Sequence, residues 1–540
     1  MNQIEGNIVD IVNRRTIKGR LYYSNTIQKI EHDNSVLSEK FILPGLIDAH
    51  VHIESSMLTP LEYSKAALRH GVIAAVTDPH EIANVCGVEG VNFMVENARK
   101  SPMKIYFGAP SCVPATDFET AGDIISAHQI EQLFASGTCS HLSEMMNFPG
   151  VIFNDPMVLE KLQIAKKHNK KIDGHAPLLS GSNLIKYVEA GISTDHECTN
   201  ISEAIEKINL GMMIMLRNSS ASKDFDQLIS LIGSNPDSIM FCTDDCHPDN
   251  LEKTYINGMV KEALLQKFDL YDTLRAATKN ATDHYQLNVG LLQVGDPSDF
   301  IVIDSLKQFN ILSTVIDGVE VYDGKKILFN QKNDKTINQF YENSIELDDL
   351  KVLKTSNSIN VIQVVPNSLL TRKFEYFTTS ESLYHEINID NDILKIVVLN
   401  RYKKAKPAVA FIKGMGIKDG AIAQTIAHDS HNIVAVGTDE LLIQKAIHAL
   451  NQSKGGMVVC DHQMFQLLPL PIASLMSDQD CSTVAFQYKE MTKLVHNMGS
   501  TLQSPFMTLA FMSLLVIPEL KLGDKGLFDV NKFAFIDLQN

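Results

Sequence analysis

Eight short apolar runs between residues 40 and 245 constrain the fold of this chain more than any other feature. Each run ends in a polar or small residue, and helical periodicity separates most of them. The runs are FILPGLIDAHVH (41–52), VIAAVTD (72–78), KIYFGA (104–109), CSHLSEMM (139–146), KIDGHA (171–176), ISTDHE (192–197), MMIMLR (212–217) and SIMFCTDD (238–245). Eight strand–helix units predict an α/β fold, a (β/α)8 TIM-type barrel. An open doubly wound sheet alternates in the same way, but the Gly-x-Gly-x-x-Gly loop that often marks it is absent.

The segments that flank the barrel have a different pattern. Residues 1–42 and 296–345 contain short Val/Ile-rich runs punctuated by Gly, Asp and Asn, which predicts strands and turns. Neither segment can bury a core alone, so we expect one small composite β-sandwich domain beside a barrel over 43–295. The stretch 331–349 is polar, as in a linker. We expect a further α/β domain over 350–540.

Composition limits the classes of partner and compartment. The net charge of −16 disfavours nucleic acid, because phosphate binding needs clustered Lys and Arg. The eight cysteines show no framework spacing, which favours a reducing compartment. The first residues lack the apolar core of a signal peptide, and the longest apolar stretch, 506–517, is shorter than the ~20 residues that span a bilayer. We therefore expect a cytoplasmic protein with no membrane partner.

Histidine and carboxylate residues follow most of the apolar runs. His50 and His52 are two positions apart, so on a strand both side chains point to one face. Such a pair alone is often just two partly exposed histidines. In a barrel, however, the carboxyl ends of the strands share one face, and a divalent cation needs this mixture of ligands. The strand-end residues are His50, His52, Asp78, His80, Glu81, Glu144, His175, His196, Glu197, Asp244 and Asp245.

Six segments carry a resemblance to a known family. They are PGLIDAHVHIESSMLTP (44–60), TDPHEIANVCG (77–87), GHAPLLSG (174–181), GISTDHECT (191–199), FCTDDCHPDNL (241–251) and AHDSHNIVAVG (427–437). Together they resemble the amidohydrolase superfamily and, within it, the bacterial adenine deaminase family, over nearly the whole chain. The resemblance implies hydrolytic conversion of adenine to hypoxanthine and ammonia in purine salvage. It also implies two divalent metals, Mn2+ with Fe2+ or Zn2+ possible. We expect a homo-oligomer, a dimer or larger.

The resemblance also implies the metal ligands. It gives His50, His52 and Asp244 to one ion, His175 and His196 to the other, and Glu144 to both. Many superfamily relatives bridge their metals with a carboxylated lysine from the fourth strand, whereas SHLSEMM contains no lysine and offers Glu144. A surface carboxylate at a helix start is the alternative for Glu144.

Three residues are expected to move protons. Asp244, both ligand and base, would take a proton from the attacking water and return it to the departing amine. Glu81, with His80, is the candidate acid for a ring nitrogen, which requires a protonated Glu81 carboxyl at the working pH. Asp78 before Pro79 is equally well explained as a helix N-cap.

Other residues are weaker candidates for binding the substrate. Ser180 and Gly181 fit ordinary turn chemistry equally well. Arg217 has a structural ion pair as its alternative, and the segment at 428–429 belongs to another domain, where it caps the site or binds nothing. The full set of candidates is Glu54, Ser180, Gly181, Arg217, Asp245, His428 and Asp429.

Two positions depart from the family pattern. Tyr255 follows Thr254 where relatives usually carry a Gly-His pair, and Asn218 stands where they usually carry Glu. These departures put the rate or the identity of the aminopurine in doubt. The alternatives are therefore an amidohydrolase for another aminopurine or a cyclic amide, and a metal-binding homologue with little turnover. The signature of the unrelated zinc deaminases has no counterpart in the chain.

Overall fold

A computed structural model describes residues 1–540 except 221–223, 334, 367 and 540. The chain forms two compact units. The barrel unit comprises Met1–Pro79, Met94–Ser111 and Ser126–Asn333. The second unit comprises His80–Phe93, Cys112–Ile125 and Asp334–Asn540. The three-domain division expected from the sequence stays a prediction.

Eight parallel strands form the barrel, which confirms the predicted fold class. They are β5 (Leu46–Val51), β6 (Val72–Thr77), β7 (Lys104–Ala109), β8 (His141–Met145), β9 (Ile172–Gly174), β10 (Thr194–Asp195), β11 (Met213–Arg217) and β12 (Ile239–Cys242). Ser193 N donates to Ile172 O at 2.9 Å beside β9 and β10. Asp244 N donates to His50 O at 2.9 Å, which joins the end of β12 to β5 and closes the ring of strands.

The first apolar run proves to be two strands in different sheets. Gly45 alone separates the end of β4 (Phe41–Pro44) from the start of β5. A Cβ on Gly45 would lie 2.5 Å from the side chain of Ile73, so only glycine allows this close passage. The run therefore changes sheets at one residue.

β4 belongs to a seven-stranded sheet of order β15-β14-β13-β4-β1-β2-β3. Its other strands are β1 (Asn2–Asp10), β2 (Arg15–Tyr23), β3 (Ile27–His32), β13 (Phe300–Ile303), β14 (Ile311–Ile316) and β15 (Val319–Tyr322). Ile8, Leu21, Ile42 and Phe300 pack together in its core. The segments before and after the barrel thus form one composite sheet. This agrees with the expectation that neither segment could bury a core alone.

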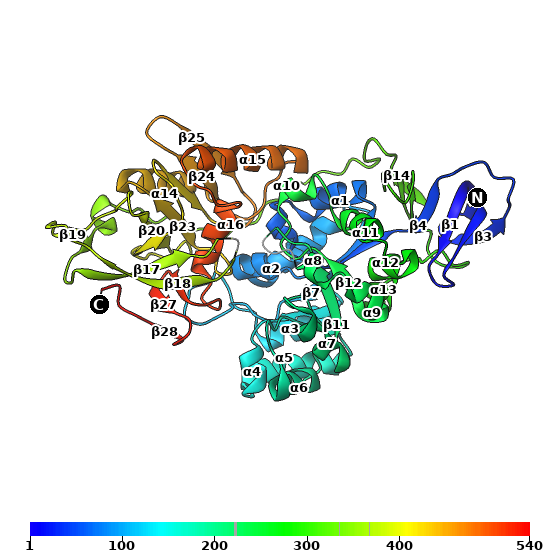
Figure 1. Cartoon of the computed structure of the whole chain (residues 1–540), viewed down its shortest axis with the longest axis horizontal. Helices are drawn as coiled ribbons and strands as arrows, with labels where there is room; N and C mark the ends of the chain where they lie inside the picture. The colour runs from blue at the N-terminus through cyan, green and yellow to red at the C-terminus, as the bar shows by residue number, and fades with distance from the viewer. Residues whose placement is uncertain (221–223, 334, 367, 540) are drawn as a thin grey trace. The chain divides into compact units, whose positions relative to one another are not determined.

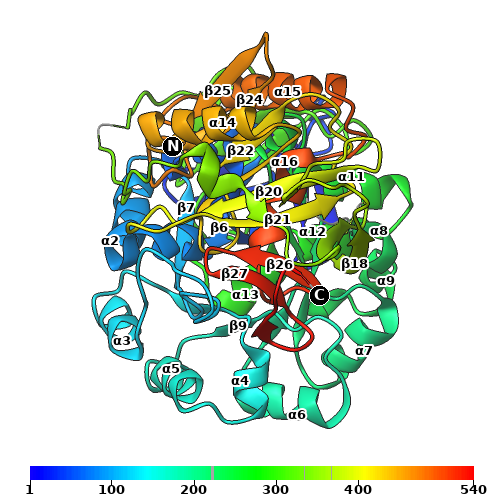
Figure 2. The same cartoon turned by 90° about the vertical axis from the view of Figure 1, so that its left-hand side faces the viewer.

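Helices connect the barrel strands. α5 begins after Asp155, whose carboxylate accepts the N–H of Met157 at 2.8 Å, with Pro156 in the first turn. Helices α3, α4, α5 and α6 lie beside one another (Figures 1 and 2). The helices are η1 (Ile53–Ser56), α1 (Pro60–Arg69), α3 (Ala127–Ala135), α4 (Phe148–Ile152), α5 (Pro156–Lys167), α6 (Gly181–Glu189), α7 (Ile201–Asn209), α8 (Phe225–Leu228), α9 (Leu231–Ser234), η2 (Pro236–Ser238), α10 (Pro248–Leu251), α11 (Ile256–Leu265), α12 (Leu270–Ala276) and α13 (Lys279–Tyr285); α2 (His80–Ala98) runs from the second unit into the barrel unit.

An eight-stranded sheet of order β18-β17-β21-β20-β23-β22-β24-β25 organises the second unit. Its strands are β17 (Ser358–Val364), β18 (Thr371–Phe377), β20 (Ile393–Leu399), β21 (Ala408–Lys413), β22 (Ala421–Gln424), β23 (Ile433–Gly437), β24 (Gly456–Cys460) and β25 (Phe465–Pro469). The smaller elements are η3 (Leu347–Leu350), β16 (Val352–Leu353), β19 (Tyr384–His385), β26 (Leu520–Gly523), β27 (Gly526–Asp529) and β28 (Ala534–Phe535).

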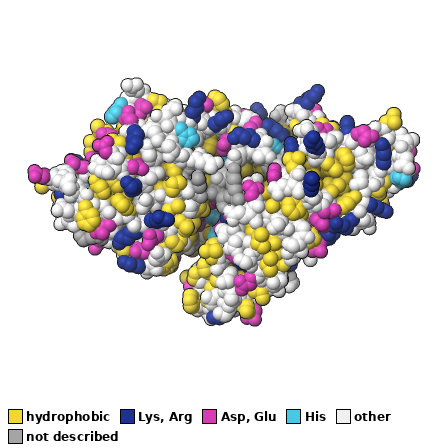
Figure 3. All heavy atoms as spheres, viewed as in Figure 1, with side chains coloured by type: hydrophobic (Ala, Val, Ile, Leu, Met, Phe, Trp, Pro, Cys, Tyr) yellow, Lys and Arg dark blue, Asp and Glu magenta, His cyan; other side chains and the backbone are white. Residues whose placement is uncertain are grey.

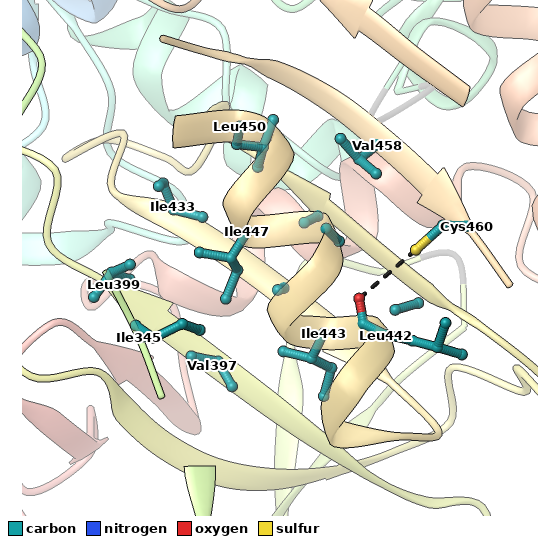
Figure 4. Packing of buried hydrophobic residues seen from close by; sticks show 14 of the residues in the cluster. Ile345, Val397, Leu399, Ile433, Leu442, Ile443, Ile447, Leu450, Val458 and Cys460 are labelled. Carbon is teal, nitrogen blue, oxygen red and sulfur yellow. Dashed lines mark hydrogen bonds between the residues drawn. The ribbon is translucent and has the colours of Figure 1, made fainter. Parts of the chain in front are cut away.

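Helix α14 (Glu440–Ser453) covers one face of this sheet. Its residues Ile443, Ile447 and Leu450 pack with Val397 and Val458 in a buried cluster (Figure 4). α15 (Cys481–Asn497) and α16 (Pro505–Ala510) follow, and the buried η4 (Phe511–Ser513) completes the long apolar stretch as a core element. Within the described residues, no helix has both the length and the hydropathy to cross a membrane. On the face shown in Figure 3, basic and acidic side chains are interspersed.

Candidate metal centre

The barrel strands bring three histidines onto one carboxylate. Glu144, in β8, is buried, and its Oε2 lies 2.9 Å from His175 Nδ1 and 3.1 Å from His196 Nε2. Its Oε1 lies 3.3 Å from Nε2 of His52, which follows β5. Each histidine comes from the end of a different strand. Glu144 therefore faces the barrel interior rather than solvent, which removes the alternative of a surface carboxylate.

Asp244 brings the end of β12 into the same cluster. Its Oδ1 lies 3.2 Å from His52 Nε2 and 3.6 Å from His50 Nε2. The backbone of Asp244 has φ of 55°, a left-handed conformation, and its N–H donates to His50 O. The imidazole rings of His50 and His196 stack with centroids 4.1 Å apart. All six predicted ligands thus lie in one cluster, in which His175 is partly exposed and the other five are buried.

The donor atoms of this cluster fit a divalent cation. Three groups each place their donor atoms within 4.8 Å of one another: His50, His196 and Asp244; Glu144, His175 and His196; and His52, Asp244 and Asp245. The 3.6 Å contact between His50 and Asp244 is too long for a hydrogen bond. Buried imidazoles and carboxylates at such spacing are the ligand set of zinc, iron and manganese sites.

Without a metal, neutral and protonated imidazoles stand beside ionised carboxylates in this cluster. Burial, together with the neighbouring His196, lowers the pKa of His50 to about 4, so its imidazole is neutral as a ligand must be. Burial opposes ionisation of Glu144, but the attraction of His175 and hydrogen bonds from the imidazoles hold its pKa well below the usual range. Burial likewise lowers the pKa of His175, yet Glu197 and Glu144 raise it to about 9. In the metal-free cluster, protonated His175 supplies positive charge to these carboxylates.

Arg217, at the end of β11, pairs with the buried carboxylates of Asp224 and Asp244 and with the partly exposed carboxylate of Glu197. Its Nη2 lies 2.7 Å from Asp224 Oδ2, and its Nη1 lies 3.0 Å from Asp244 Oδ2. The guanidinium also pairs with both oxygens of Glu197. The structure therefore shows the ion pair that was the alternative for Arg217, and its contact with a substrate stays a prediction.

The remaining candidates of the barrel unit divide into two pairs. Glu54 and Asp245 are buried, and the Asp245 carboxylate accepts a hydrogen bond from the Ser55 hydroxyl. Ser180 and Gly181 are exposed at the start of α6, where the Gly181 N–H donates to Glu206 at 2.8 Å. The second pair is thus placed as turn chemistry predicts, whereas the first pair lies beside metal-centre residues.

A second group of buried histidines and carboxylates lies in the second unit. Nδ1 of His428 is 2.7 Å from Glu81 Oε1, and His431 contacts the other oxygen of Glu81. Nε2 of His80 lies 3.5 Å from Glu81 Oε1 and 4.0 Å from Asp429 Oδ1. All five side chains are buried. The AHDSH segment thus meets the start of α2 within one unit, which the sequence left open.

The surroundings of Glu81 contradict the expectation that its carboxyl is protonated at the working pH. Burial alone would raise the pKa of its carboxyl, but His428, His431 and His80 hold that pKa well below the usual range. Glu81 is therefore ionised near neutral pH. A proton available at this cluster is carried by an imidazole rather than by the carboxyl.

Sequence reasoning missed several residues that support the metal centre. Asp48 precedes His50 by two positions and so shares its face, a signal that the strand period offered. Asp224 and Lys207 lie in segments without a recognisable motif. Asp224 lies 7 residues after its partner Arg217, and Lys207 lies 12 residues after its partner Asp195. Neither spacing is a motif of metal sites.

The comparisons with known proteins agree with this geometry. Residues 41–321 match the amidohydrolase family, and residues 368–534 match the adenine deaminase C-terminal domain. The adenine deaminase of Methanosarcina mazei is 47% identical over 100% of this chain and 99% of its own length. That of a Sulfurovum species is 46% identical over 99% of each chain.

Solved structures of lower similarity include the β-aspartyl dipeptidase of Fervidobacterium islandicum. It is 15% identical, has a TM-score of 0.47, and covers 61% of this chain and 100% of its own. The family assignment depends on the sequence matches, which extend over the whole chain. The chain belongs to the amidohydrolase family and, within it, to the adenine deaminases.

Proposed function

We propose that this protein converts adenine and water to hypoxanthine and ammonia. The observation that carries the proposal is the largely buried cluster of four histidines and two carboxylates at the strand ends, in a chain whose full-length relatives are adenine deaminases. The family implies a divalent metal, and this cluster supplies its donors. In β8 the sequence HLSEM contains Glu144 and no lysine, which argues against a carboxylated lysine as the group that bridges the metals in this chain.

Six residues would hold two cations in this proposal. We assign His50, His52 and Asp244 to one, His175 and His196 to the other, and Glu144 to both. Both carboxylate oxygens of Glu144 face imidazoles, which supports a bridging role. When bound, two divalent cations lower the pKa of a water molecule so that attack on C6 of the purine is possible near neutral pH.

Asp244 is the proposed base. Burial disfavours its charge, but the adjacent imidazoles of His50 and His52 and the charge of Arg217 hold its pKa well below the usual range. Its carboxylate is therefore ionised and able to accept the proton that the attacking water loses. It returns this proton to the exocyclic amine, which leaves as ammonia. Arg217 binds Oδ2 and leaves Oδ1 directed at the histidines.

Glu81 and His80 are the proposed groups for the proton of the purine ring nitrogen. The ionised Glu81 would hold a protonated imidazole of its cluster, and that pair would supply the proton. For substrate binding we propose Glu54, Ser180, Gly181, Arg217, Asp245, His428 and Asp429.

Ammonia release tests the proposal. The protein, purified with Mn2+, is incubated with adenine, adenosine, guanine or cytosine. Turnover of adenine alone is expected, and Asp244→Asn, which keeps the shape of the side chain, is expected to abolish it. No release from adenine in a metal-replete sample would contradict the function.

The cation, the compartment and the assembly are finer parts of the proposal. We propose Mn2+, with Fe2+ and Zn2+ as the alternatives that reconstitution of the metal-free protein compares. The eight cysteines are all buried and show no framework spacing, which supports a reducing, cytoplasmic location. We propose a homo-oligomer, which light scattering would report as two or more chain masses.

A further inference from the structure

A buried column of oxygen atoms lies at the ends of β5 and β12. It consists of the side chains of Asp48, Thr243, Tyr255 and Tyr63, each at most 3% exposed. These residues come from β5, from the end of β12, from the start of α11 and from α1. All belong to the barrel unit. None of them was a predicted ligand or base.

The carboxylate of Asp48 joins the two strands. Its Oδ1 accepts the backbone N–H of His50 at 3.2 Å and that of Thr243 at 3.1 Å. Its Oδ2 accepts the Thr243 hydroxyl and the Tyr255 hydroxyl, the latter at 2.5 Å. Four donors thus converge on one buried carboxylate, and such a network is rigid only while each member is satisfied.

The two backbone groups bound by Asp48 stand beside metal-centre residues. His50 is a proposed ligand, and Thr243 directly precedes Asp244, the proposed ligand and base. The Asp48 carboxylate therefore fixes the register between the strand ends that carry these two side chains. Loss of a donor to a buried carboxylate leaves it under-satisfied, which favours a shift of the strands that it joins.

Tyr255 binds the Asp48 carboxylate from the start of α11 rather than from a barrel strand. Its backbone N–H donates to Asn257 Oδ1 at 3.0 Å at the start of α11, which holds the residue in place. Its hydroxyl lies 2.5 Å from that of Tyr63, so Tyr63 contacts the column at its outer end. Removal of the Tyr63 hydroxyl would leave the bond between Tyr255 and Asp48 intact.

We propose that Tyr255 is a positioning residue that acts through Asp48 to hold His50 and Asp244 at the spacing that divalent cations require. The proposal rests on the proposed function, because it assigns Tyr255 to the metal centre of that function. In this proposal Tyr255, which departs from the family pattern, supports the metal ligands and does not contact the purine. Supporting groups of this kind typically contribute ~10–100-fold to metal affinity.

Metal binding tests the proposal independently of turnover. Mn2+ is titrated into metal-free wild-type protein, Tyr255→Phe and the matched control Tyr63→Phe, and the dissociation constants are compared. Tyr255→Phe is expected to bind Mn2+ ~10–100-fold more weakly. Tyr255→Phe should also have a lower kcat than the wild type, and its KM for adenine should stay within about twofold of the wild-type value, because Tyr255 does not contact the purine in this proposal. Tyr63→Phe is expected to bind Mn2+ like the wild type.

Thr243→Val provides a second variant, because it removes the other hydroxyl from the same carboxylate oxygen and should weaken Mn2+ binding in the same direction. Thermal unfolding of each metal-free variant checks that the fold is retained. Wild-type Mn2+ affinity in Tyr255→Phe, or an equal loss in Tyr63→Phe, would overturn the positioning role. A wild-type protein that binds Mn2+ but releases no ammonia from adenine would instead defeat the proposed function alone.

Discussion

Arg217 illustrates how one residue fixes the charge balance of the metal centre. Its planar guanidinium contacts Asp224, Asp244 and Glu197, all with limited exposure. Loss of one partner from a buried ion pair typically lowers stability by ~3–5 kcal/mol, because the remaining charges stay buried without compensation. We therefore expect Arg217→Met to lower the free energy of unfolding by ~3–5 kcal/mol in urea titrations of the metal-free protein.

A surface pair provides the control for this prediction. Arg69 and Glu252 lie 3.6 Å apart with about a third of each side chain exposed. Such pairs contribute ~0–1 kcal/mol, so Arg69→Met should change stability by no more than that. Equal effects of the two substitutions would mean that the Arg217 network contributes no more than a surface contact.

Lys521 gives a residue-scale prediction of pH dependence. Its Nζ donates to the carbonyls of Leu369 and Phe511, both at 2.9 Å, and burial lowers its pKa to about 7. The unfolded state therefore binds more protons than the folded state between this value and the unperturbed pKa of 10.5, so stability rises with pH across that window.

From pH 7 to 9 this group alone should raise the free energy of unfolding by about 2 kcal/mol. Lys521→Met removes the titration, so unfolding curves of the two proteins measured at both pH values isolate it. Parallel pH profiles of wild type and variant would contradict the lowered pKa.

The two-residue period of the strands predicted site residues only where neighbouring sequence indicated them. It placed His50 and His52 on one face, and the ends of later runs indicated Glu144 and Asp244. It could not predict the partner of Tyr255, because a buried hydroxyl finds its acceptor across the barrel. The charge of Glu81 was predicted wrongly for the same reason: His428, its hydrogen-bond partner, lies 347 residues later in the chain.

At the scale of elements, buried charge ties a helix to two strands of the metal centre. Lys207 of α7 contacts Asp195 of β10, donates to Ala176 O after β9 at 2.7 Å, and donates to Glu203 at 2.8 Å. Asp195 also accepts the Ala176 N–H at 3.1 Å. These contacts stand beside His175 and His196.

Lys207→Met is therefore expected to lower the free energy of unfolding by ~3–5 kcal/mol. The double variant Lys207→Met/Asp195→Asn should lose less stability than the sum of the losses in the two single variants. Urea titrations of the metal-free wild type, both single variants and the double variant complete the cycle. Additive effects would show that the two charges do not interact.

Element boundaries were predicted less well than element types. All eight barrel strands were found, because each is a buried apolar run that ends in polar residues. The change of sheet at Gly45 was missed, since β4 and β5 form one continuous apolar run and only packing against Ile73 separates them. β10 spans only Thr194–Asp195, shorter than its run.

At the scale of the whole molecule, segments distant in the sequence complete each unit. The strands at 2–44 pair with those at 300–322 in one sheet, and His80–Phe93 belong to the unit formed mainly by residues after 334. From the small size of these segments the sequence predicted that they combine into a composite β-sandwich, and the structure shows one seven-stranded sheet. The sequence assigned residues 80–93 to the barrel by order along the chain, because it held no information on the partners of Glu81.

We propose that strand ends of the barrel hold two divalent cations with Glu144 between them. The metal content of protein purified with Mn2+, measured by mass spectrometry for wild type and Glu144→Ala, tests this proposal. We expect two ions per chain in the wild type and at most one in the variant. Two ions retained in Glu144→Ala would contradict the proposed bridging role.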